Sequence, residues 1–171
     1  MTGPVAVTFD GQSSVSDAPC FLRVTLLNRP YGHIAEPWDR EVIDCEVRVD
    51  ADAFKGHYAS TIWGHELVVI RAVLAALSAR VGQEAEGFID LLENAFAIKF
   101  MLTPLGHLTM EIVARGHPGM GPELHFSMEA DQSYLPLWIK QLDEALAAFP
   151  AEVPVDVSDP LRFRGPEPVR E

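Results

Sequence analysis

The sequence has few of the features that mark a secreted or membrane-bound protein. Only two cysteines occur in 171 residues, which is too few for a disulfide framework. No apolar run approaches the length of about 18 residues that a membrane span requires. The N-terminal stretch MTGPVAVTFDGQSS has neither a basic region nor a long apolar segment, so no signal peptide is expected. We therefore expect a cytoplasmic protein without a membrane segment.

Positive charge is also scarce. The chain has 13 lysines and arginines against 25 aspartates and glutamates, which gives a formal net charge of -12. A field of this sign repels nucleic acid and attracts a basic protein partner. An acidic surface that only keeps the protein soluble is the alternative explanation. With three lysines and no Gly-Lys-Ser/Thr sequence, a phosphate-binding loop is absent as well.

Catalytic and metal-binding motifs are missing from the sequence. The stretch HELVV begins like the zinc motif H-E-x-x-H, but Val69 stands where the second histidine would be. The six histidines are scattered, and no G-x-S-x-G elbow occurs. We therefore predict no catalytic residue, no metal ligand and no cofactor. A metal-dependent hydrolase with dispersed histidine and carboxylate ligands remains an alternative.

What the sequence does contain is strict alternation of apolar and polar residues. Ile43, Cys45, Val47 and Val49, for example, alternate with charged residues, which predicts a strand with one buried face. Similar alternation recurs in five other places, over 5–9, 22–26, 96–102, 108–114 and 124–128, with two weaker segments at 54–63 and 87–93. Pro104 and Gly106 supply a tight turn for a hairpin. The pattern predicts about 7–8 mainly antiparallel strands.

Two segments have helical periodicity instead. Leu67, Ile70, Leu74, Leu77 and Val81 recur at steps of three and four residues, which predicts a helix over about 64–81. A second helix is expected over about 136–148. Long helices that follow groups of strands indicate an α+β domain in which the helices cover the sheet. We place this single domain at residues 1–149 and a proline-rich extended tail at 150–171.

The stretch EADQSYL, residues 129–135, joins the last predicted strand to the last helix. Pro136 favours the first turn of a helix. Asp131 can accept a hydrogen bond from the backbone of Ser133 or Tyr134, as in an Asx turn. A structural turn is therefore favoured over a recognition site.

The order of these segments resembles a known family. A hairpin, FAIKFMLTPLGHLTMEIVARG, precedes a strand ending in FSMEADQSYL and a final helix, LWIKQLDEALAAFP. Together they are similar to the WapI-type bacterial immunity proteins and their uncharacterised relatives. The specific match is Asp131, Gln132, Ser133, Tyr134 and Leu135, and the order of elements agrees over about residues 5–149. The resemblance implies a cytoplasmic, non-enzymatic protein that binds and neutralises a cognate toxin, commonly a nuclease.

Two loops are the best candidates for contact with such a protein partner. The first, at 31–41, carries Tyr31, Trp38 and Asp39; the second, at 116–122, carries Met120. Exposed aromatic and methionine side chains are typical interface anchors. For Trp38, packing back on the core is an equal alternative. The main competing function is a structural or regulatory protein that forms a homodimer through a sheet edge.

Overall fold

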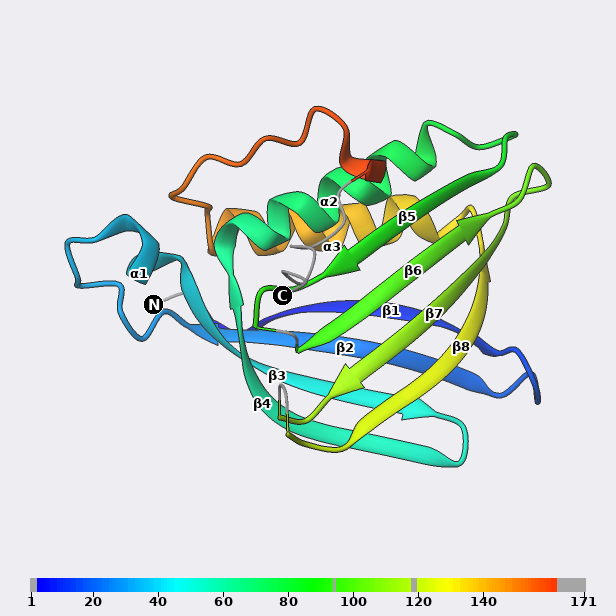
Figure 1. Cartoon of the computed structure of the whole chain (residues 1–171), viewed down its shortest axis with the longest axis horizontal. Helices are drawn as coiled ribbons and strands as arrows, with labels where there is room; N and C mark the ends of the chain where they lie inside the picture. Colours follow the sequence, from blue (N-terminus) through cyan, green and yellow to red (C-terminus); the bar gives the residue numbers. More distant parts are fainter. Residues whose placement is uncertain (1–2, 94, 118–119, 163–171) are drawn as a thin grey trace, which may run out of the picture.

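The computed structural model describes residues 3–93, 95–117 and 120–162 (Figure 1). Eight strands and two 15-residue helices follow one another as two halves, each with four strands and then a helix. The first half contains β1 (Val5–Ser13), β2 (Pro19–Asn28), β3 (Val42–Ala51), β4 (Phe54–Trp63) and α2 (Gly64–Ser78). The second contains β5 (Ala85–Asp90), β6 (Phe96–Leu102), β7 (His107–Arg115), β8 (Glu123–Asp131) and α3 (Tyr134–Ala148). Two short helices, α1 (Pro37–Glu41) and η1 (Pro160–Arg162), complete the described chain.

All eight strands form one antiparallel sheet in the order β4-β3-β2-β1-β8-β7-β6-β5. The predicted α+β class with a mainly antiparallel sheet is therefore confirmed. The two halves of the sheet meet only at β1 and β8, through the pairs Gln12↔Glu129 and Ser13↔Met128. Away from this junction the two half-sheets diverge, so the sheet is strongly curved (Figure 1).

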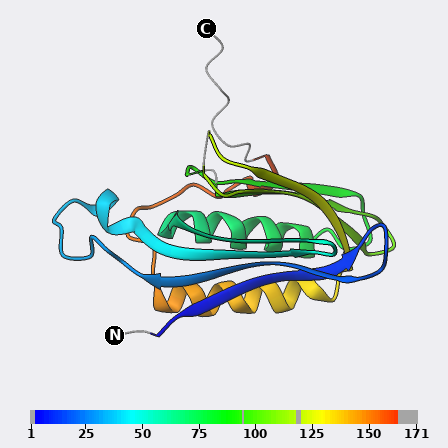
Figure 2. The same ribbon diagram turned by 90° about the horizontal axis from the view of Figure 1, so that it is seen from below.

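The two long helices fill the space inside the curved sheet, and Figure 2 shows both running along the long axis of the molecule. Helix α3 packs on β1, whereas α2 packs on β5. Trp138 of α3 is fully buried, with its ring 5.6 Å from that of Phe9. The side chain of Gln141 accepts a hydrogen bond from Thr8 N at 2.6 Å. Each half of the chain therefore covers the first strand of the other half.

The helix boundaries differ from those predicted. Helix α2 ends at Ser78 and not near residue 81, and Val81 is 42% exposed. The chain turns here towards β5, with hydrogen bonds from Arg80 N to Leu77 O and from Gln83 N to Arg80 O. Gly82 has φ of +90°, a conformation that glycine adopts most readily. Helix α3 begins two residues earlier than predicted, at Tyr134, and α1 was not predicted at all.

The described part of the C-terminal segment, residues 150–162, lies against the rest of the protein. Helix η1 contacts both α2 and β5. Val155, Val157 and Leu161 are partly buried against the core. This segment therefore packs against α2 and β5.

Candidate partner-binding surface

The loops of the protein gather at two opposite ends. The described residues of four connections lie at one end, which we call the α1 end (Figure 1): 29–41, 91–93 with 95, 116–117 with 120–122, and 149–153. The hairpin turns at 14–18, 52–53 and 103–106 and the β8–α3 turn lie at the other, which we call the hairpin end. Tyr31, Trp38, Asp39 and Met120, the predicted contact residues, are all at the α1 end. The family motif Asp131–Leu135 is at the hairpin end.

Trp38 of α1 is half packed and half exposed. Its ring centroid lies 6.1 Å from that of Trp63 and 5.7 Å from that of His65, in edge-on arrangements. Trp63 is the last residue of β4, and His65 lies in the first turn of α2. Trp38 nevertheless remains 55% exposed. One side of the indole is therefore fixed by neighbours, while the other is available for contact.

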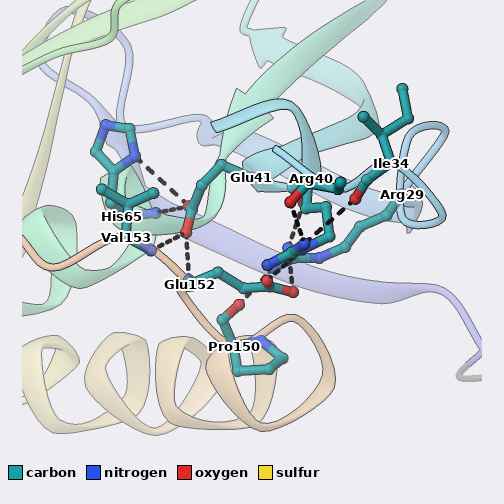
Figure 3. A network of polar contacts seen from close by, with 9 residues as sticks. Arg29, Ile34, Arg40, Glu41, His65, Pro150, Glu152 and Val153 are labelled. Carbon is teal, nitrogen blue, oxygen red and sulfur yellow. Dashed lines mark hydrogen bonds and ion pairs between the residues drawn. The ribbon is translucent and has the colours of Figure 1, made fainter. Parts of the chain in front are cut away.

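A buried carboxyl group holds α1 in place. Glu41, the last residue of α1, is fully buried. Its Oε2 accepts a hydrogen bond from His65 N at 2.6 Å, at the N-terminus of α2. Its Oε1 accepts hydrogen bonds from Val153 N at 2.6 Å and from Glu152 N (Figure 3). Glu41 thus joins α1, α2 and the segment after α3. This role of Glu41 was not predicted, since nothing in the neighbouring sequence distinguishes Glu41 from a solvated loop residue.

Two arginines extend this network towards the surface (Figure 3). Arg40 Nε lies 2.6 Å from Glu152 Oε2, and Arg40 Nη1 donates to the carbonyl of Ala35 at 2.7 Å. Arg29 donates to the carbonyls of Arg40 and Pro150. These contacts of Arg29 and Arg40 order the loop at 29–41 in the free protein. The loop would therefore lose less conformational entropy on binding a partner.

A second buried carboxyl group lies under the same surface. Glu66 accepts hydrogen bonds from Trp63 N at 2.8 Å and from Leu92 N at 2.5 Å. Burial raises the pKa of Glu66 to about 7, because the low-polarity surroundings disfavour the charged form. Glu66 and His65 line a cavity of about 50 Å³ together with Leu92, whose side chain is exposed.

The exposed side chains at the α1 end make a mixed apolar and acidic surface. We call it the anchor surface and define it as Tyr31, Glu36, Trp38, Asp39, Leu92 and Glu93. Carboxylates beside aromatic and aliphatic side chains suit a basic partner that also buries apolar area. Met120 is 98% exposed in a separate loop, beside a cleft between β4 and the β7–β8 turn.

The family motif joins the start of α3 to the β6–β7 turn through hydrogen bonds. Asp131 Oδ1 accepts a hydrogen bond from Ser133 N at 2.7 Å, and the bonds from Ser133 lower the pKa of Asp131. Gln132 N donates to Gly106 O at 2.8 Å. Gly106 has φ of +83°, and a Cβ there would lie 2.5 Å from Gln132 Oε1.

The last two residues of the motif anchor the helix. Leu135 is fully buried, and the ring of Tyr134 lies 5.7 Å from that of Trp138. The motif therefore maintains the fold, at the end of the molecule opposite the anchor surface.

Replacing Asp131 by alanine removes the acceptor for Ser133 N in the turn that precedes α3, and is therefore expected to lower the free energy of unfolding. Urea denaturation measures this change. Asp131→Asn keeps an oxygen acceptor for Ser133 N and should retain most of the stability. Equal losses in the two variants would show that charge, and not the turn, is what Asp131 contributes.

Among residues 3–93, 95–117 and 120–162, no group of three or more histidine, cysteine or acidic side chains could hold a metal ion. Within the same described residues, no helix has the length and apolar character needed to cross a membrane. Cys20 and Cys45 are free and buried, and burial raises the pKa of the Cys45 thiol to about 12.

Comparison with known proteins supports the sequence resemblance. The Immunity protein WapI-like family matches residues 14–150. No curated protein matches the chain. Six solved chains match, including one from the crystal structures of Trypanosoma bruciei MRP1/MRP2, at 12% identity, 84% coverage of each chain and a TM-score of 0.43. Because the family match extends over most of the chain, this protein belongs to the WapI-like immunity protein family.

Proposed function

We propose that this protein is a non-enzymatic, cytoplasmic inhibitor that binds and neutralises a basic cognate toxin, a nuclease. The observation that carries this proposal is the match of residues 14–150 to an immunity protein family. The inhibitor acts by occupying a surface of the toxin, and it needs no chemistry of its own.

The anchor surface supports the proposal because it combines rigidity with exposed apolar groups. Glu41 and Arg40 fix the loop that carries Trp38. A pre-ordered aromatic anchor loses little conformational entropy on binding, so more of its contact energy appears as affinity. Trp38 and Tyr31 are of the residue types that most often dominate binding energy in protein interfaces.

The charge of the protein supports a basic partner. A net charge of -12 accelerates encounter with a positively charged nuclease, whose own substrate is a polyanion. Salt screens this attraction, since the Debye length shortens as ionic strength rises. Association with the toxin should therefore be strongly dependent on salt.

The test is binding to a catalytically inactivated form of the toxin domain encoded beside the gene. Trp38→Ala is expected to weaken binding by tenfold or more, which corresponds to about 1.4 kcal/mol or more. Raising the salt from about 50 to 300 mM should slow association more than it speeds dissociation. Surface plasmon resonance measures both rate constants.

Leu105→Ala is the matched control, because Leu105 is fully exposed at the hairpin end. Its affinity should equal that of the unaltered protein. Absence of binding in the unaltered protein would refute the toxin-inhibitor function. An equal loss of affinity in the Leu105 variant would refute the anchor surface as the binding site but not the toxin-inhibitor function.

A further inference from the structure

The outer edge of β4 differs from the other edge of the sheet. β4 is an end strand, paired along its whole length with β3 and with no strand on its other side. In the described chain, no backbone hydrogen bond joins Phe54–Ile62 to anything but β3. The strand at the opposite end of the sheet, β5, contacts α2 and η1. A long uncovered edge offers a row of N–H and C=O groups to an added strand.

A cleft of about 430 Å³ opens along this edge. One wall consists of five consecutive residues of β4, Phe54–Tyr58, together with Val49 of β3. Successive residues of a strand point to opposite faces. Because side chains from both faces line the cleft, it runs along the strand edge and not over one face of the sheet. The other wall is formed by the end of β7, the start of β8 and part of the turn between them.

The cleft has room for a side chain opposite Gly56. A Cβ built on Gly56 itself would have only one heavy atom within 4 Å, Val49 Cβ at 3.8 Å. Phe54, which is 66% exposed, and the partly buried Leu124 provide apolar walls on either side. A strand glycine is a position where an aromatic side chain of the neighbouring strand packs well.

The surroundings of the edge favour a basic segment. The β3–β4 hairpin carries four carboxylates, at Asp44, Glu46, Asp50 and Asp52, against the cations Arg48 and Lys55. Glu123 lies on the opposite wall. Basic residues flanking the apolar side chain would therefore gain electrostatic energy.

The edge also leads to the anchor surface. β4 ends at Trp63, the residue against which Trp38 packs. A partner held at Trp38 is therefore positioned beside the free edge of the strand that begins at the cleft.

We propose that the β4 edge binds an extended segment of the toxin as a ninth strand, with an apolar side chain of that segment seated over Gly56 and basic residues beside it. This rests on the proposed toxin-binding function and specifies how the partner is held. The strand's backbone groups provide hydrogen bonds, and the cleft provides selectivity for the side chain.

Gly56→Val tests this proposal, because it fills the space over Gly56 while β-branched residues suit a strand. Affinity for the inactivated toxin domain should fall at least tenfold, with no loss of thermal stability. Ala59→Val is the matched control, since Ala59 is exposed on the opposite face of the same strand. Its affinity should be unchanged. Hydrogen–deuterium exchange should show slower exchange of β4 amides in the complex, and unchanged exchange in the turn at 103–106.

The outcomes separate this inference from the proposed function. Toxin binding that is equally strong in both variants, with unchanged exchange in β4, overturns the added strand and leaves the toxin-inhibitor function intact. Failure of the unaltered protein to bind toxin overturns both. A dimer of the protein alone that Gly56→Val dissociates, seen by sedimentation, would assign the edge to a second copy and overturn the toxin segment as its occupant.

Discussion

Replacing Glu41 by alanine is expected to lower the free energy of unfolding by about 4 kcal/mol, because one buried and two partly buried backbone N–H groups lose their acceptor. Each such group costs about 1–3 kcal/mol when it is unsatisfied. The donors are the N–H groups of His65, Glu152 and Val153. The loss is measured by urea denaturation followed through tryptophan fluorescence. Water that enters the site would reduce the effect.

Glu36→Ala is the control for this experiment. Glu36 precedes α1, is exposed, and makes no side-chain capping hydrogen bond. Its replacement should change stability by no more than about 0.5 kcal/mol. Similar losses in the two variants would contradict the structural role of Glu41.

Gly64 provides an independent check on the same contact. A Cβ at Gly64 would lie 2.6 Å from Glu41 Oε2, so Gly64→Ala should also destabilise the protein. In the Glu41→Ala background this clash is gone, and Gly64→Ala should cost less. The two changes are therefore expected to be non-additive, as contacting residues usually are. Additive effects on the free energy of unfolding would show that the clash with Glu41 is not the reason why position 64 requires glycine.

The second large effect is a dependence of stability on pH that comes from Glu66. Its pKa rises from 4.5 to about 7 on folding. Below the lower value the group is protonated in both states, and it does not destabilise the fold. As pH rises from about 4.5 to 7, the unfolded state ionises more readily, so stability is lost. The shift corresponds to a loss of about 3 kcal/mol.

Glu66→Gln isolates this contribution, because glutamine carries no ionisable proton. Unfolding free energies of both proteins are measured between pH 4.5 and 8, and their difference should change by about 3 kcal/mol. The unfolding free energy of the variant also differs from that of the unaltered protein by an amount that does not depend on pH. The reason is that an NH2 group replaces one of the two oxygens that accept hydrogen bonds from Trp63 N and Leu92 N. Parallel curves would show that Glu66 has an ordinary pKa in the fold.

Local patterns in the sequence predicted much of the fold. The alternation around Cys45 and the turn at Gly106 each depend on neighbouring residues, and the strands and hairpin that they predict are present. The hydrogen bond between Asp131 and Ser133 is likewise a contact between near neighbours. Periodicity failed at Val81, where the apolar spacing continues although the chain has already turned.

The organisation of the site could not be predicted in this way. The hydrogen bonds of Glu41 to the C-terminal segment join residues more than 110 positions apart. Burial raises the pKa of Glu66, and one of the groups that contact this carboxyl, Leu92 N, belongs to the other half of the chain. Trp38 was predicted as a contact residue from its type, but its packing on Trp63 requires α1 to be held by these distant bonds.

The exchange of helices between the two halves has a consequence for synthesis in the cell. β1 is synthesised before α3, the helix that covers it, and Thr8 and Gln141 are separated by 133 positions. The apolar face of β1 therefore stays uncovered until α3 has been synthesised. Likewise, Glu41 accepts its hydrogen bond from Val153 N only after residue 153 has been synthesised. A chain that stops before α3 would leave β1 without the helix that covers it.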